Sequence, residues 1–185
     1  MYQQETKDLV ADGASYIQLD SLAYVAPGIP ADVLTRQIAV DNALAGAVDR
    51  SKATVGLHMC RGNNQGSWIS EGTYESAAKA LNELKVDRLL LEYDTARSGG
   101  FEPLRAVSKD KTVVLGLIST KTPQLESIDT LRRRIDEAAR YLPLENLAIS
   151  PQCGFASSEY GNPIDWDTQR RKLELVVETA RRIWG

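Results

Sequence analysis

The sequence predicts an α/β fold of repeated strand–helix units, arranged as a β/α (TIM) barrel of which about five units are present. Short apolar runs alternate with helical patterns, and the runs recur about every 35 residues, as in units that feed a parallel sheet. Polar residues that can act as metal ligands, acids or bases follow the runs directly. An open parallel α/β sheet is the structural alternative. Residues 1–185 contain no linker, so we expect a single domain or a partial barrel.

Each predicted strand is a short apolar run bounded by turn residues. The runs are Tyr16–Leu19, Thr54–Leu57, Arg88–Leu91, Thr112–Leu117 and Asn146–Ile149. Apolar residues at helical spacing predict the helices Gln4–Ala11, Pro30–Asp49, Thr73–Leu84, Ile128–Tyr141 and Asp167–Trp184, and a weaker one over Glu102–Val107. Pro30 suits a first helical turn. The last two long helices have the candidate caps Ser127 or Asp129 and Asp165 or Asp167.

The composition excludes several classes of protein. With 22 Lys and Arg against 25 Asp and Glu, and a formal net charge of -3, the chain lacks the positive charge of a nucleic-acid binder. No apolar run approaches the roughly 20 residues that span a bilayer, and the start does not resemble a signal peptide. Two cysteines cannot form a disulfide scaffold. We therefore expect a cytoplasmic protein without a nucleic-acid or membrane partner.

Seven residues whose side chains can act as metal ligands, acids or bases cluster just after the predicted strands. They are Asp20, His58, Cys60, Glu92, Asp94, Lys121 and Cys153. In a β/α barrel the active site forms at the C-terminal ends of the strands, so this placement favours a barrel with a working face. The sequence has no GxGxxG motif and no Walker loop, which weakens a nucleotide-binding interpretation.

The single histidine of the chain lies two residues from one of its two cysteines, in the segment Leu57–Cys60. This H-x-C pair indicates metal ligands, although a satisfied histidine beside a buried free thiol would give the same pattern. Glu92 and Cys153, also at strand ends, complete a set of His58, Cys60, Glu92 and Cys153. Tetrahedral zinc accepts these ligand types, so we expect zinc as the cofactor.

The segments LHMCRGN, LLLEYDTARS and SPQCGF resemble the three zinc-ligand segments of the C-terminal catalytic barrel of the cobalamin-independent methionine synthase family. The resemblance runs from Tyr16 to Cys153, and the 61 residues from Glu92 to Cys153 fit the spacing in the family. It implies a zinc-dependent methyltransferase that transfers the N5 methyl group of a methyltetrahydrofolate to the thiol of homocysteine and makes methionine. The partners would be this small-molecule thiol and the methyl donor.

The resemblance also implies residue roles. Asp20 matches the carboxylate that holds the homocysteine ammonium, although an aspartate at a strand end often bonds main-chain amides instead. Lys121 lies where the family has a catalytic histidine near the leaving pterin nitrogen. Apart from the resemblance, Asp94 and Arg97 lie near Glu92 in the sequence, which places them to orient it or to pair with each other on the surface.

The segment CRGN is closer to shorter relatives, which include uncharacterised methyltransferase-like proteins and the epoxyalkane coenzyme M transferases. There Arg61 would bind a substrate sulfonate. The alternatives to methionine synthesis are therefore a zinc-dependent thiol alkyltransferase of that type and a non-catalytic zinc-binding subunit. Because eight βα units take about 200 residues or more, we expect only the C-terminal units of a barrel, completed by an upstream segment or by self-association.

Overall fold

The five strands form one parallel sheet in the computed structural model, which describes residues 1–156 and 158–185. They are β1 (Tyr16–Ser21), β2 (Thr54–Met59), β3 (Arg88–Glu92), β4 (Thr112–Ile118) and β5 (Leu147–Pro151). All five predicted strands are confirmed, and each extends one or two residues beyond its predicted end.

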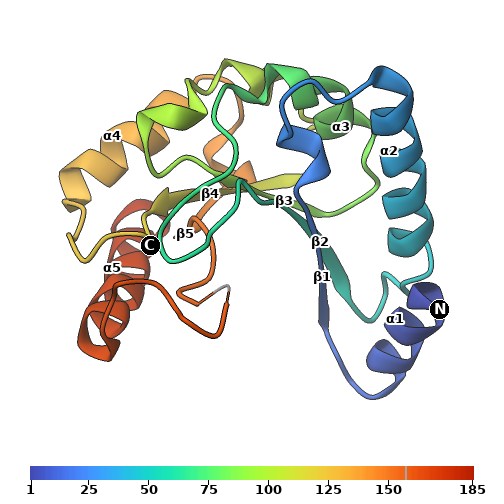
Figure 1. Cartoon of the computed structure of the whole chain (residues 1–185), viewed down its shortest axis with the longest axis horizontal. Helices are drawn as coiled ribbons and strands as arrows, with labels where there is room; N and C mark the ends of the chain where they lie inside the picture. The colour runs from blue at the N-terminus through green and yellow to red at the C-terminus, as the bar shows by residue number, and fades with distance from the viewer. Residues whose placement is uncertain (157) are drawn as a thin grey trace.

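The strand order in the sheet is β1-β2-β3-β4-β5, the same as the order along the chain. A doubly wound sheet reverses its order at a switch point, whereas successive barrel strands do not. The sheet is open and curved, and the helices follow the outside of this arc (Figure 1). The α/β prediction is confirmed, and the arrangement is that of part of a barrel.

The helices differ from the predicted ones mainly at their ends. They are α1 (Tyr2–Ala11), α2 (Ala31–Ala45), α3 (Ala78–Glu83), α4 (Ile128–Ala138) and α5 (Trp166–Trp184), with 3-10 turns η1 (Ala23–Val25), η2 (Tyr74–Ala77), η3 (Ala96–Ser98), η4 (Glu102–Ala106) and η5 (Leu144–Asn146). The prediction of a single α-helix over residues 73–84 was wrong, because its first turn is the 3-10 turn η2 and only α3 is α-helical. Of the candidate caps, Ser127 and Asp165 accept main-chain N–H bonds from Thr130 and Thr168. Among the described helices, none has the length and apolar character needed to cross a bilayer.

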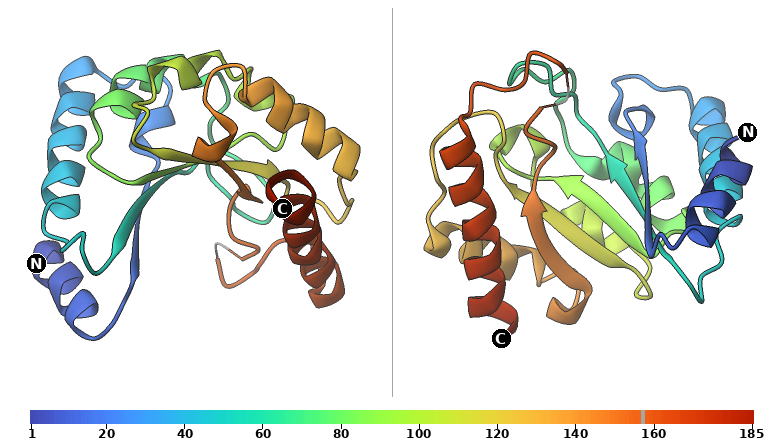
Figure 2. Two further views of the ribbon diagram at one scale, coloured as in Figure 1. Left: turned by 180° about the vertical axis from the view of Figure 1, so that it is seen from behind. Right: turned by 90° about the horizontal axis from the view of Figure 1, so that it is seen from below.

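The core lies between the sheet and the outer helices. Strand side chains alternate between the two faces, so Val55, Leu57 and Leu89 are buried toward the helices. Leu90 and Val114 point to the inner face of the arc and are only half buried. Figure 2 shows α5 beside one end of the sheet and α1 and α2 beside the other. The curvature therefore leaves an open inner face, and the C-terminal ends of the five strands lie along one edge of it.

Candidate metal centre

The C-terminal edge of the sheet brings the predicted ligands together. His58 lies on β2 and Cys60 follows that strand, Glu92 ends β3, and Cys153 follows β5. Parallel pairing sets Asp20 of β1 beside His58. Because parallel strands end at a common edge, ligands far apart in the sequence meet there.

The four candidate ligand atoms lie close enough together to surround one cation. One atom from each of His58, Cys60, Glu92 and Cys153 lies within 4.8 Å of all the others. The two sulfurs are 4.0 Å apart, and Nε2 of His58 is 3.3 Å from Oε1 of Glu92. For zinc bonds of about 2.3 Å to sulfur and about 2.0 Å to nitrogen or oxygen, a regular tetrahedron has edges of about 3.8 Å and 3.3 Å. The two measured pairs match these edges.

The imidazole of His58 is held by two carboxylates. Its Nδ1 is 3.2 Å from Oδ1 of Asp20, which leaves Nε2 facing Glu92. Nε2 is buried and pairs with Glu92 at 3.3 Å without a well-oriented hydrogen bond, and coordination to a cation would satisfy it. Burial would lower the pKa of His58, but the carboxylates of Asp20 and Glu92 outweigh it and raise the pKa to about 10. A metal must therefore displace a proton from His58.

Glu92 is fully buried and supported by three hydrogen bonds. Its Oε1 accepts from the main-chain N–H of Arg61 at 2.9 Å, and its Oε2 accepts from Arg97 at 2.9 Å and from Gln152 at 3.2 Å. Burial would raise the pKa of Glu92, but His58, the Arg61 amide and Arg97 hold it below its ordinary value. Glu92 is therefore a carboxylate in a fixed orientation, as a metal ligand requires.

The two cysteines are half buried beside each other. The hydrogen bond to Cys153 and burial raise the pKa of the Cys60 thiol well above its ordinary value. Gly62 donates its N–H to Cys60 Sγ at 3.4 Å, and its φ of 89° lies in the region that favours glycine. The Cys60 thiol therefore remains protonated until a cation favours its thiolate. Together with the buried Nε2 of His58, which lacks a well-oriented hydrogen bond, and the spacing of the donors, this fits zinc.

Lys121 reaches the centre through Gln152, a residue that sequence reasoning missed. The Lys121 ammonium donates to Oε1 of Gln152 at 2.7 Å, while Nε2 of Gln152 donates to Glu92. Gly116 permits this approach, since a Cβ there would stand 2.7 Å from Cα of Gln152. Burial lowers the pKa of Lys121, and the nearby Glu92 partly offsets this. The available signal was only that Gln152 adjoins Cys153.

Three other predicted residues take different positions. Asp20 contacts His58 while its side chain remains 61% exposed at the inner face. Arg61 is 1% exposed, with its guanidinium 4.3 Å from the ring centroid of Tyr74, so its side chain points into the core and the predicted sulfonate role stays a prediction. Arg97 bonds both Glu92 and Asp94, and the side chains of Arg97 and Asp94 are buried, so the pair orients Glu92 and the predicted surface pairing is wrong.

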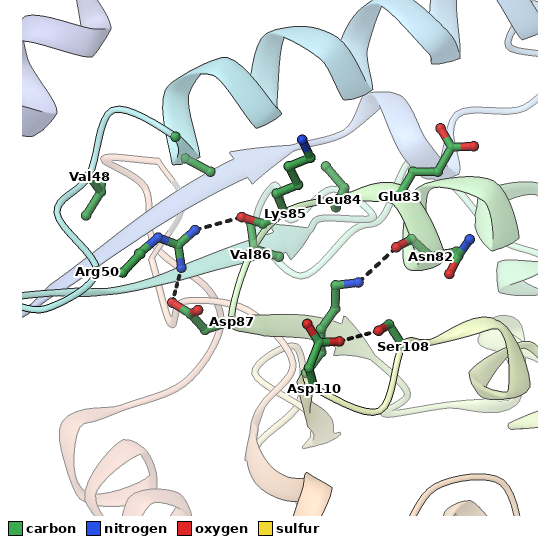
Figure 3. Close-up of a pocket in the computed structure, with 13 residues that line it drawn as sticks. Val48, Arg50, Asn82, Glu83, Leu84, Lys85, Val86, Asp87, Ser108 and Asp110 are labelled. Atoms are coloured by element: carbon green, nitrogen blue, oxygen red, sulfur yellow. Dashed lines mark hydrogen bonds and ion pairs between the residues drawn. The ribbon is translucent and has the colours of Figure 1, made fainter.

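Two pockets lie at opposite ends of the strands. A pocket of about 180 Å³ at the C-terminal edge is lined by His58, Gly116, Gln152 and Cys153 among others. A larger hollow of about 570 Å³ lies at the other end, where Arg50 pairs with Asp87 and bonds the Lys85 carbonyl (Figure 3). Residues at that end of βα units serve stability, whereas ligands bind at the strand C-termini. The smaller pocket is thus the candidate substrate site.

Comparisons with known proteins agree with this placement. The family described as "Cobalamin-independent synthase, Catalytic domain" matches residues 1–182. The chain is 42% identical over 199 residues to "Uncharacterized protein YxjG" of Bacillus subtilis, with 99% of this chain and 52% of that protein covered. It is 31% identical over 180 residues to a methionine synthase of Pyrococcus furiosus, with 97% and 46% covered.

A solved structure shows the same fold. The chain resembles the putative vitamin-B12 independent methionine synthase from Listeria monocytogenes with a TM-score of 0.73 and 26% identity, over 100% of this chain and 53% of that one. The chain spans about half the length of the curated relatives it matches. The arc of five strands therefore corresponds to part of a longer barrel.

Proposed function

The chain belongs to the catalytic-domain family of the cobalamin-independent methionine synthases, and from this premise we propose that it is a zinc-dependent methyltransferase that makes methionine from homocysteine and a methyltetrahydrofolate. The observation that carries the proposal is the cluster of His58, Cys60, Glu92 and Cys153 at the strand C-termini. Methyl transfer to a thiol requires a thiolate nucleophile, and this donor set is suited to producing one.

His58, Cys60, Glu92 and Cys153 would hold the zinc ion. When bound, zinc stabilises the acceptor thiol as a thiolate at neutral pH. Two cysteine thiolates and one carboxylate bring three negative charges against the two positive charges of the cation. With zinc bound, the net charge near -1 would keep a substrate sulfur electron-rich and hence nucleophilic. Asp20 and the hydrogen-bond donors to Glu92 orient these ligands.

We assign the amino group of homocysteine to Asp20. Its carboxylate stands at the open inner face beside His58, and its side chain is accessible to a charged ligand. A carboxylate attracts the substrate ammonium and so fixes which way the thiol points. The pocket beside Cys153 is of a size for a small amino acid.

We assign proton transfer to the leaving nitrogen of the donor to Lys121. The methyl group moves from the pterin N5 to the thiolate sulfur, so the C–N bond breaks, a C–S bond forms, and the departing nitrogen needs a proton. Burial lowers the pKa of Lys121, which makes its ammonium a better acid than an exposed lysine. Gln152 holds that ammonium on the same side as Glu92.

The test combines metal analysis with product analysis. We expect about one zinc per chain, and methionine formed from homocysteine and methyltetrahydrofolate triglutamate only when zinc is present. A wild-type protein that stays empty after zinc supplementation would refute the metal centre. A zinc-loaded protein that methylates neither homocysteine nor another thiol would instead be a non-catalytic zinc-binding subunit.

A further inference from the structure

Lys172 is a fully buried charged residue on α5, which no step of the proposed chemistry uses. Its ammonium donates to the main-chain carbonyl of Gln124 at 2.5 Å and lies 3.3 Å from Oε2 of Glu126. Burying a lysine costs free energy unless a partner compensates for the lost hydration. The ion pair joins α5 to the loop between β4 and α4, the loop that carries Lys121.

From Glu126 a continuous set of hydrogen bonds leads to the metal centre. Oε1 of Glu126 accepts from the main-chain N–H of Ser119 at 2.8 Å, and the Ser119 hydroxyl donates to Oδ2 of Asp94 at 3.0 Å. The other oxygen of Asp94 accepts from Nη2 of Arg97 at 2.8 Å, and the same Nη2 donates to Glu92 at 2.9 Å. The side chains of Asp94, Arg97 and Glu92 are almost wholly buried.

We propose that the Lys172–Glu126 ion pair positions the metal centre from a distance, by fixing the set of hydrogen bonds that holds the Glu92 carboxylate in place. Lys172 and Glu126 are positioning residues. The inference rests on the proposed function, because it takes Glu92 as a metal ligand. Lys172 and Glu126 lie outside both the ligand cluster and the sequence motifs.

The physical reason is the sharing of Arg97 between two carboxylates. While Ser119 occupies one oxygen of Asp94, Arg97 can divide its Nη2 between Asp94 and Glu92. Without Lys172, Glu126 is a partly buried carboxylate without its cation, and the loop must move to hydrate it. Ser119 then leaves Asp94, Arg97 turns toward the freed carboxylate, and Glu92 loses a charged donor.

The same loop sets the position of Lys121. The Ser119 hydroxyl accepts from the main-chain N–H of Lys121 at 3.3 Å, so a shift of Ser119 also displaces the lysine that reaches Gln152. The Lys172–Glu126 ion pair therefore affects both the metal ligand Glu92 and the proton donor Lys121.

The test is the substitution Lys172→Met, which keeps most of the side-chain volume but removes the charge. We expect zinc binding about 10- to 100-fold weaker, measured by competition with a chelator, the range found when partners of metal ligands are removed. The absorption spectrum of the cobalt(II)-substituted protein should also change, because it reports the ligand geometry. Lys172→Arg should restore both properties in part. If Lys172→Met does not fold, Glu126→Gln is read by the same measurements.

The matched control is Lys111→Met. Lys111 is also buried, and its ammonium bonds the carbonyl of Asn82 at 2.9 Å, in the hollow at the opposite end of the sheet. The substitution Lys111→Met should lower the free energy of unfolding without changing the zinc affinity or the absorption spectrum of the cobalt(II) protein. Folded Lys172→Met with wild-type affinity and spectrum would overturn the inference, as would equal effects of Lys111→Met. Wild-type protein that binds no metal would overturn the proposed function and this inference together.

Discussion

Replacing Cys153 by serine tests the metal centre directly. The substitution removes one of two sulfur ligands and leaves His58, Cys60 and Glu92 as donors, since a serine hydroxyl is not deprotonated at neutral pH. Zinc sites with four protein ligands have binding free energies of about 10 to 16 kcal/mol. One quarter of this is about 3 kcal/mol, so Cys153→Ser should weaken zinc binding at least about 100-fold.

The assay is zinc competition with a chromophoric chelator, together with the metal content of the protein as purified. The cobalt(II)-substituted protein gives a second readout. Its thiolate-to-cobalt charge-transfer absorption should fall by about half when one of the two thiolates is lost. Ser150→Ala is the matched control, since it removes a nearby hydroxyl that bonds the carbonyl of Pro151 and is not among the ligand atoms. Wild-type zinc affinity in Cys153→Ser would refute the assignment of Cys153 as a ligand.

Lys121, the protonated ligands and the edges of the sheet can each be tested. Lys121→Ala should lower turnover more than thiol affinity, and Lys121→His should recover activity; an unchanged turnover would leave Lys121 without a catalytic role. Zinc binding near pH 7.5 should release about two protons, one from His58 and one from Cys60, because the pKa values of both are raised in the metal-free protein. Zinc affinity should therefore weaken as the pH falls. Calorimetry in two buffers of different ionisation enthalpy measures the protons released, and no release would contradict these protonation states. The chain alone should self-associate, because β1 and β5 are unpaired edges of a parallel sheet and the inner face is open; a stable monomer by light scattering at micromolar concentration would contradict this.

The position of the candidate site follows from local features of the sequence. Strand and helix patterns depend on residues a few positions apart, so the five strands and most helix starts can be predicted from spacing and capping chemistry. Polar residues at the ends of parallel strands must share one edge, and this brings His58, Glu92 and Cys153 together despite their separation along the chain. The ligand types then indicate the metal, because sulfur, imidazole and carboxylate donors suit zinc.

Several contacts at the site depend on long-range packing and are encoded in no local pattern. Arg61 follows a ligand directly, yet its side chain turns into the core to stack on Tyr74, a choice that depends on packing across two segments. Gln152 acquires its place between Lys121 and Glu92 only because Gly116 lets the segment after β5 approach closely. Local sequence patterns set which elements form and which donors reach the common edge. Which way each side chain turns there, and which distant partner holds it, depends on long-range packing and burial, and so appears only in the folded chain.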